Sequence, residues 1–334
     1  MKRMSRVFML LVLMAVVGLP TAPVRAAKRT WTVTVGGGVK NMQVVSNAFS
    51  PRAIEVAVGD TVTWVFQPTW PVHTVTFLSG QQPPPLLVPE GDKTYGSPQV
   101  FFPAGGTTYD GTGYRNSGLP SEDPLKRSTY SLTFTKAGTY QYLCLLHGPA
   151  MSGTVIVGER VSASPAAVAA RAQRELAATL KAGQAAFAKW SPERQGNTVV
   201  APLVGNPKEG WSVFRFTREP LVITSGTTVT WTMRDPFEIH TVTFPSGQKG
   251  LAFLIPQPQK QGPPKLLLDP RVGTPTKIQA YDGESYVNSG ILFPPGSPAN
   301  LPKNFSLTFT KPGRYGYVCV VHALEGMSGT IIVK

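Results

Sequence analysis

The sequence predicts an all-β protein made of two β-sandwich domains that are joined by a helical linker. Three observations predict this fold class. The 334-residue chain contains two copies of one pattern, each longer than 100 residues. Within each copy, short segments alternate between apolar and polar residues and are separated by glycine and proline, as the strands of a sandwich are. Only one segment, between the copies, has the apolar period of a helix.

The internal repeat predicts the domain organisation. Four segments of the first half match four of the second half: TVTWVFQPTWPVHTVTFLSGQ (61–81) with TVTWTMRDPFEIHTVTFPSGQ (228–248), YDGTGYRNSGLP (109–120) with YDGESYVNSGIL (281–292), YSLTFTKAGTYQYLCLLH (130–147) with FSLTFTKPGRYGYVCVVH (305–322), and MSGTVIV (151–157) with MSGTIIV (327–333). Two long copies indicate a duplicated domain and not a solenoid of short repeats. We therefore expect domains at 27–157 and 199–334, with a linker at 158–198.

The elements within each copy follow from the same patterns. Residues 61–66 alternate in period two, and HTVTF continues that alternation. KAGTY (136–140) and KPGRY (311–315) are turns that lead into the next strand. The long proline-rich loops between TVTF and YDG should not contain regular strands, because proline lacks the N–H that a ladder needs. We expect these loops to cover one end of each sandwich.

The linker contains one convincing helix, from Ser164 to Trp190. Ser164 can cap its N-terminus, and Pro165 suits the first turn. Its apolar residues fall near one face: Val168, Ala172, Leu176, Leu180, Phe187 and Trp190. We expect the helix to pack as a linker and not to bind a partner.

Residues 1–26 predict an export signal peptide. Lys2 and Arg3 precede the apolar run 7–18, which is too short to span a bilayer comfortably, and small residues precede a cleavage point after Ala26. An uncleaved anchor is the alternative. We therefore expect a periplasmic or extracellular protein with no integral membrane segment after cleavage.

The charge of the chain is positive but diffuse. The formal net charge is +14, and four of the basic residues lie in the signal, which leaves +10. No basic run or basic helix face stands out, so nucleic acid is a poor partner. An acidic protein or an anionic surface fits this charge.

Cysteine, histidine and methionine gather in two matching sets. CLLHGPAM (144–151) and CVVHALEGM (319–327) each follow a strand whose alternating tyrosines mark its buried face. Each stretch needs a second histidine, and the only ones left begin the two HTVTF strands. The candidate metal ligands are His73, Cys144, His147 and Met151 in the first copy, and His240, Cys319, His322 and Met327 in the second.

The chemistry of these sets points to copper. One thiolate, two imidazoles and a more distant thioether form the donor set that copper uses in electron transfer. Zinc also accepts cysteine and histidine, but structural zinc seldom has a methionine ligand. Three alternatives remain: a Cys144–Cys319 disulfide, methionines that only fill the core, and histidines with structural roles. Repetition of the whole set favours ligation.

These segments resemble the cupredoxins, the type 1 blue copper proteins that include plastocyanin, pseudoazurin and amicyanin. The resemblance rests on GDTVTW and GTTVTW, the histidine of HTVTF, the NSG segments, GTYQYLCLLH and GRYGYVCVVH, and the closing MSGT. It covers nearly all of both halves. It implies a tandem pair of Greek-key sandwiches, with one type 1 copper held at one end of each by the four residues named above. His147 and Met151 are separated by three residues, where plastocyanin-like loops and the second copy have four.

The leading functional hypothesis is an exported electron-transfer protein with two type 1 coppers. Its partners would be redox proteins, such as a cytochrome with an acidic surface. His147 and His322 would pass the electron if the proline-rich loops leave them partly exposed. The alternatives are a two-domain copper oxidase or nitrite reductase-like enzyme and a copper storage or delivery protein. Such an enzyme needs further histidines for a type 2 or trinuclear site, and none remain, while delivery needs a site that exchanges its ligands easily. We therefore expect no enzyme.

Overall fold

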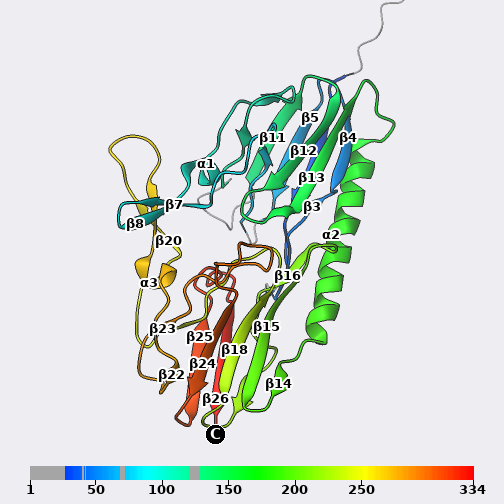
Figure 1. The fold of residues 1–334 in the computed structure, drawn as a ribbon. Coiled ribbons are helices and arrows are strands. Elements are labelled where there is room, and N and C mark those ends of the chain that lie inside the picture. The colour runs from blue at the N-terminus through cyan, green and yellow to red at the C-terminus, as the bar shows by residue number, and fades with distance from the viewer. Residues whose placement is uncertain (1–26, 40, 42, 68–71, 120–127) are drawn as a thin grey trace, which may run out of the picture.

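The computed structural model describes residues 27–39, 41, 43–67, 72–119 and 128–334. Two β-sandwiches follow one another along an elongated molecule, and one long helix runs beside both (Figure 1). The predicted all-β class, with two Greek-key sandwiches and a helical linker, is confirmed. No helix in the described part of the chain is long and apolar enough to cross a membrane. The predicted export signal lies outside the described residues.

The first sandwich is formed by two five-stranded sheets. One has the order β3 (Phe49–Ser50), β1 (Thr30–Val35), β5 (Thr61–Phe66), β11 (Ser128–Phe134) and β9 (Thr108–Tyr109). The other has the order β10 (Arg115–Asn116), β6 (Thr76–Phe77), β12 (Gly138–Cys144), β13 (Gly148–Gly158) and β4 (Ala53–Ala57). Inward-facing residues fill the space between them. Trp64 from the first sheet meets Tyr142 from the second edge to face, with ring centroids 5.2 Å apart.

The second sandwich repeats this plan. One sheet has the order β2 (Val44–Ser46), β16 (Trp211–Val213), β15 (Thr198–Asn206), β18 (Thr228–Arg234), β24 (Asn304–Phe309) and β22 (Ala280–Tyr281), and β14 (Glu193–Gln195) also pairs with β15. The other has the order β17 (Leu221–Ile223), β26 (Ser328–Val333), β25 (Gly313–Val318), β19 (Thr243–Phe244) and β23 (Val287–Asn288). Trp231 meets Tyr317 at 5.3 Å, in the same way as the equivalent pair of the first half.

Backbone pairing joins the two halves. Strand β2 comes from the first copy, yet it pairs antiparallel with β16 of the second, with Val45 opposite Ser212. This pairing between the halves could not be predicted from the sequence, because β2 is only three residues long and follows no motif of the repeat. Its pairing fixes the end of the first sandwich against the end of the second.

The predicted linker helix forms α2 (Pro165–Ala188). The Ser164 hydroxyl accepts a hydrogen bond from the Ala167 N–H at 3.2 Å, which is the expected cap. The helix packs along β1, β2, β3 and β16 and so contacts both halves. A side chain at Gly183 would collide with Val44, since a Cβ there would lie 2.4 Å from its Cγ1. This close approach explains why glycine suits this position of the helix.

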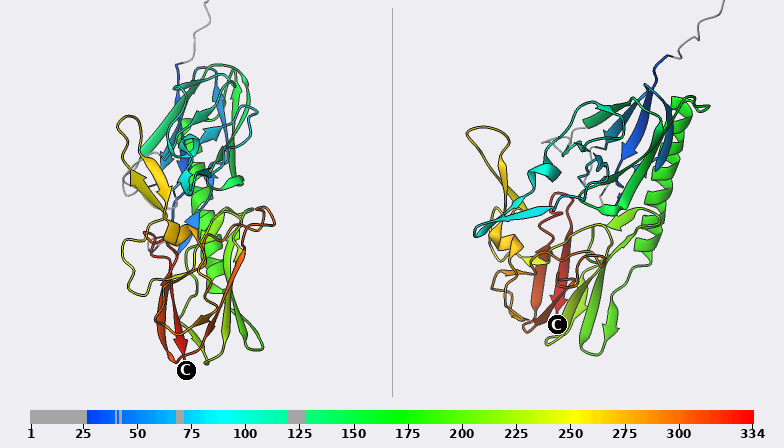
Figure 2. Two further views of the ribbon diagram at one scale, coloured as in Figure 1. Left: turned by 60° about the vertical axis from the view of Figure 1, so that its left-hand side comes forward. Right: turned by 45° about the horizontal axis from the view of Figure 1, so that its top comes forward.

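The proline-rich loops form a small sheet of their own, so the expectation that they contain no strands was wrong. Strands β7 (Leu87–Glu90) and β8 (Lys93–Gly96) pair with β20 (Leu254–Gln257) and β21 (Lys265–Leu268) in the order β20-β21-β8-β7. Pro89 and Pro256 lie in the two edge strands, where a missing N–H breaks no ladder. Figures 1 and 2 show the two hairpins side by side, so the sheet is a second connection between the halves. Two short helices, α1 (Pro98–Phe101) and α3 (Pro270–Gly273), follow the hairpins.

Candidate metal centres

In the first half, three buried side chains meet at one end of the sandwich. His73 lies just before β6, Cys144 ends β12, and His147 lies in the turn before β13. Cys144 Sγ is 3.3 Å from His147 Nδ1 and 4.0 Å from His73 Nδ1, and the two Nδ1 atoms are 3.1 Å apart. All three residues are at most 6% exposed. Their ligand atoms are close enough to hold one metal ion.

The second half contains the same cluster at its end nearest the first. Cys319 Sγ is 3.5 Å from His322 Nδ1 and 3.8 Å from His240 Nδ1, and the two Nδ1 atoms are 3.2 Å apart. The three residues are again buried. Because the corresponding distances in the two halves agree closely, the duplication preserves the geometry of the cluster as well as its sequence.

The two methionines are buried in the same cores as the cysteines. Met151 lies in β13 and is 1% exposed, and Met327 precedes β26 and is fully buried. In the second half, the Met327 N–H donates to the His322 carbonyl at 3.1 Å, and the Cys319 N–H donates to the Met327 carbonyl at 3.0 Å. The turn therefore closes around the thiol. That the two thioethers bind metal stays a prediction.

A threonine after the first histidine of each set holds the strands that carry the ligands together. The Thr74 N–H donates to Cys144 Sγ at 3.3 Å, and the Thr74 hydroxyl accepts from the Leu145 N–H at 2.8 Å. The Thr241 N–H donates to Cys319 Sγ at the same distance, and its hydroxyl accepts from the Val320 N–H at 2.8 Å. These bonds couple each histidine strand to its cysteine strand. The only sequence signal for this role was the threonine that directly follows the histidine in each HTVTF segment.

The surroundings of each cysteine favour its thiolate. Burial raises the pKa of the Cys144 thiol, but the charge and hydrogen bonds of His147 and His73 outweigh burial and hold this pKa well below its usual value. Burial and neighbouring histidines act in the same way on the pKa of Cys319. The thiolate is the form of cysteine that binds metal, so the neighbouring histidines favour the ligating form of each thiol.

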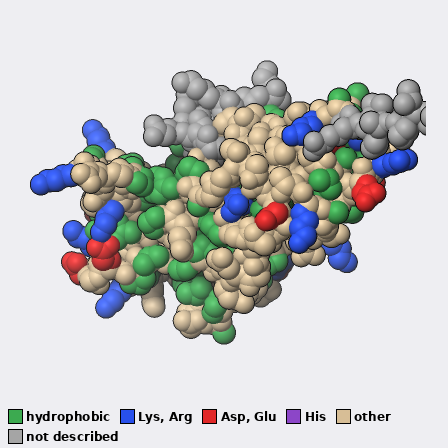
Figure 3. Space-filling view, turned by 90° about the horizontal axis from the view of Figure 1, so that it is seen from above, with side chains coloured by type: hydrophobic (Ala, Val, Ile, Leu, Met, Phe, Trp, Pro, Cys, Tyr) green, Lys and Arg blue, Asp and Glu red, His purple; other side chains and the backbone are tan. Residues whose placement is uncertain are grey.

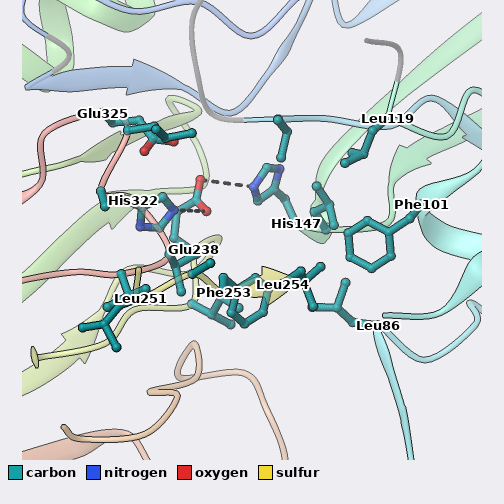
Figure 4. A pocket seen from close by; sticks show the side chains of 18 residues that line it. Leu86, Phe101, Leu119, His147, Glu238, Leu251, Phe253, Leu254, His322 and Glu325 are labelled. Carbon is teal, nitrogen blue, oxygen red and sulfur yellow. Dashed lines mark hydrogen bonds and ion pairs between the residues drawn. The ribbon is translucent and has the colours of Figure 1, made fainter. Parts of the chain in front are cut away.

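One buried carboxylate that the sequence did not reveal lies between the two clusters. Glu238 is 4% exposed and contacts His147 of the first cluster and His322 of the second (Figure 4). Burial alone would raise the pKa of Glu238, but these two histidines hold it well below its usual value. Glu238 and Cys144 in turn raise the pKa of His147 to about 10, against the effect of burial. An acidic residue between Phe237 and Ile239, where the first copy has Pro71, was the only sequence signal.

His147 and His322 line one cavity of about 380 Å³ between the halves. Most of its wall is apolar and includes Leu86 and Leu254 from the proline-rich hairpins (Figure 4). Electron transfer through these histidines was predicted on the condition that the proline-rich loops leave them partly exposed. The two histidines are only 6% and 4% exposed, so this condition is not met. The physical reason is that the two sandwiches and the hairpins cover both histidines.

The surface agrees with the prediction that the positive charge is diffuse. Lys and Arg side chains are scattered over the face in Figure 3, and no histidine is visible among its described residues. No basic patch is apparent on this face.

The donor sets fit copper. Separations of 3.1–4.0 Å are those expected between neighbouring ligands whose bonds to one metal ion are about 2.0–2.3 Å long. A single soft thiolate with two imidazoles in a buried, apolar surrounding is the set that type 1 copper prefers. No disulfide forms, since Cys144 and Cys319 are both free and buried in separate clusters.

Comparisons with known proteins agree with this chemistry. Residues 38–158 match the family model described as "Copper binding proteins, plastocyanin/azurin family". Amicyanin of Paracoccus denitrificans is 30% identical over 123 residues, which cover 37% of this chain and 68% of that protein.

Among solved structures, the reduced Cu(I) form of an amicyanin mutant at pH 4 is 27% identical, with 39% of this chain and 82% of that one covered and a TM-score of 0.23. An oxidized amicyanin mutant is 24% identical over the same shares, with a TM-score of 0.24. The family match, the amicyanin relative and the two clusters lead to one conclusion: the chain belongs to the plastocyanin/azurin family of copper-binding proteins and has two candidate copper sites.

Proposed function

We propose that this protein is an exported carrier of single electrons with two type 1 copper sites. His73, Cys144, His147 and Met151 would form the first site, and His240, Cys319, His322 and Met327 the second. The proposed organisation is a signal at 1–26, one domain at 27–157, a linker at 158–198 and a second domain at 199–334. The observation that carries the proposal is the repeated cluster of one thiolate and two imidazoles, with nearly equal distances in both halves.

Bound copper would supply one-electron oxidation and reduction at each site. The chain's own residues prepare the sites for this. The histidines and cysteines are fixed by packing and by the threonine N–H bonds, so the ligands need to move little when the charge of the site changes. Apolar residues of the cavity limit the access of water to His147 and His322.

Enzymatic turnover is disfavoured by the ligand inventory. The sequence contains four histidines, and all four belong to the two clusters. A copper that binds oxygen or nitrite needs an open position, and further imidazoles would have to hold it. We therefore expect transfer to a redox protein. The positive charge of the mature chain favours a partner with an acidic surface, and the rate should fall as salt is raised.

The test is an absorption spectrum and metal count of the copper-loaded mature protein. We expect a blue protein with about two coppers per chain, as the donor set of blue copper sites implies. Cys144→Ser and Cys319→Ser should each remove one blue centre, because each removes the only thiolate of its cluster. Persistence of both centres in either variant would show that its site is wrongly assigned.

The absence of enzymatic turnover is tested separately. The reduced, copper-loaded protein should pass electrons to a soluble cytochrome and react only slowly with oxygen. Sustained oxygen consumption or nitrite reduction at enzyme-like rates would contradict the proposed role.

A further inference from the structure

Glu238 makes hydrogen bonds to both metal clusters. Its Oε1 lies 3.1 Å from His147 Nε2, and its Oε2 lies 3.3 Å from His322 Nε2 (Figure 4). Asn47 of the first half donates a third hydrogen bond to Oε1 at 2.8 Å. The carboxylate is buried, and both of its oxygens have partners. It is the single group in the described residues that contacts a histidine of each cluster.

An ionised carboxylate can only accept hydrogen bonds. Both histidines must therefore carry a proton on Nε2 when they bind Glu238. In a neutral imidazole, the proton on one nitrogen leaves a lone pair on the other. That other nitrogen is Nδ1, which faces the thiolate in each cluster. Glu238 thus selects the tautomer that can bind metal in both halves.

Among the described residues, no carboxylate of the first half forms an ion pair with His147. The residue that corresponds to Glu238 in the repeat is Pro71, so His147 uses a group from the other copy. Asp235, which corresponds to Pro68, holds the backbone of the turn that carries Glu238. Asp235 Oδ1 accepts from the Phe237 N–H at 2.9 Å and from the Ser212 hydroxyl at 3.0 Å, which fixes the turn that carries Glu238.

A purely structural role would not require a charge at this place. The halves are already joined by the β2–β16 and β8–β21 pairs and by α2. A buried carboxylate costs several kcal/mol in desolvation, and apolar residues of similar volume often join surfaces as well or better. What the carboxylate adds is the orientation and protonation of the two imidazoles.

We propose that Glu238 is a positioning residue shared by the two metal centres, so that the first centre is completed by a residue of the second half. The proposal rests on the proposed function, since it takes the two clusters as metal sites. Residues that orient metal-binding histidines in this way change metal affinity by about 10–100-fold when they are removed.

The first test examines the protonation of the histidines in the Cu(I)-loaded wild-type protein by nitrogen-15 NMR. We expect His147 and His322 each to show an Nε2–H proton that exchanges slowly with solvent. Glu238→Gln has nearly the same shape, but its single carbonyl oxygen can replace only one of the two carboxylate oxygens. At least one of the two protons should therefore lose its protection. The proposal is overturned if either wild-type imidazole carries its proton on Nδ1, or if both protons are unchanged in the variant.

The second test measures Cu(I) affinity by competition with a chelator in chains that retain one site. In the Cys319→Ser background only the first cluster remains, and Glu238→Gln should weaken its Cu(I) affinity by about 10–100-fold. Glu325→Gln is the matched control, because Glu325 is a buried carboxylate on the same cavity that has no hydrogen bond to His147. It should leave the affinity of the first site unchanged.

The two proposals fail in different ways. If the Cys319→Ser chain binds no Cu(I) at its first cluster, the proposed function fails. If it binds Cu(I) equally well with Glu238 and with Gln at this position, the proposed function stands and the shared positioning role is wrong. Should Glu238→Gln not fold, the NMR of the wild-type protein still decides the proposal.

Discussion

Thr241→Val tests whether the threonine after the first histidine holds the second metal centre together. Valine has nearly the shape of threonine, so the change removes the hydroxyl and leaves the packing almost unaltered. The Thr241 hydroxyl accepts the Val320 N–H at 2.8 Å, and both residues are buried. Without the hydroxyl, this N–H has no acceptor and no access to water. An unsatisfied buried group costs about 1–3 kcal/mol, so we expect a loss of that size in the free energy of unfolding.

The assay is urea unfolding of the metal-free protein, with the shift in midpoint compared at constant slope. Thr74→Val provides a comparison in the same chain. It removes the equivalent bond to the Leu145 N–H, which lies at a partly buried position, so its loss should be smaller. Thr230→Val is the control, because its hydroxyl bonds Ser306 on the exposed face of the sheet. A loss for Thr241→Val no larger than for Thr230→Val would refute the reasoning.

Two other predictions concern packing and surface charge. Gly329→Ala should lower the free energy of unfolding by about 1–3 kcal/mol, because the new Cβ would lie 2.4 Å from Tyr317 Cζ and overpack a buried ring. Gly316→Ala is the control: no atom lies within 4 Å of its Cβ, so the free energy of unfolding should change much less. Equal effects of the two changes in urea unfolding would count against this account. Lys265 Nζ lies 2.6 Å from Glu90 Oε1 and so joins the two hairpins by an ion pair. Both side chains are exposed and water screens the pair, so Lys265→Ala should leave the thermal unfolding midpoint almost unchanged. A large fall in the thermal midpoint of that variant would show that this ion pair stabilises the join between the halves.

The sequence was sufficient to predict features that depend on local pattern and on repetition. The alternation around Trp64 and Trp231 predicted the strands, and Ser164 with Pro165 predicted the start of the helix. The stretches around Cys144 and Cys319, with one further histidine each, predicted which cysteines and histidines would meet. These predictions succeeded because each cluster forms within a single sandwich, whose strand order places the ligands at one end.

Features that depend on how the halves meet were not predictable. Among the described residues, the Glu238 carboxylate has no partner within its own copy except His322, and its contact with His147 exists only after the sandwiches are placed end to end. The pairing of Val45 with Ser212 and of Tyr95 with Leu267 depends on the same placement. Pro89 and Pro256 misled the interpretation of the loops, because proline is excluded from central strands but not from edges.

The most direct test of the central claim is a crystal structure of the copper-loaded protein, with anomalous scattering measured at the copper absorption edge. We expect two peaks per chain. One should lie within about 2.0–2.3 Å of Cys144 Sγ and the Nδ1 atoms of His73 and His147, and the other equally close to the corresponding atoms of Cys319, His240 and His322. A single peak, or peaks at other residues, would contradict the assignment of two copper sites.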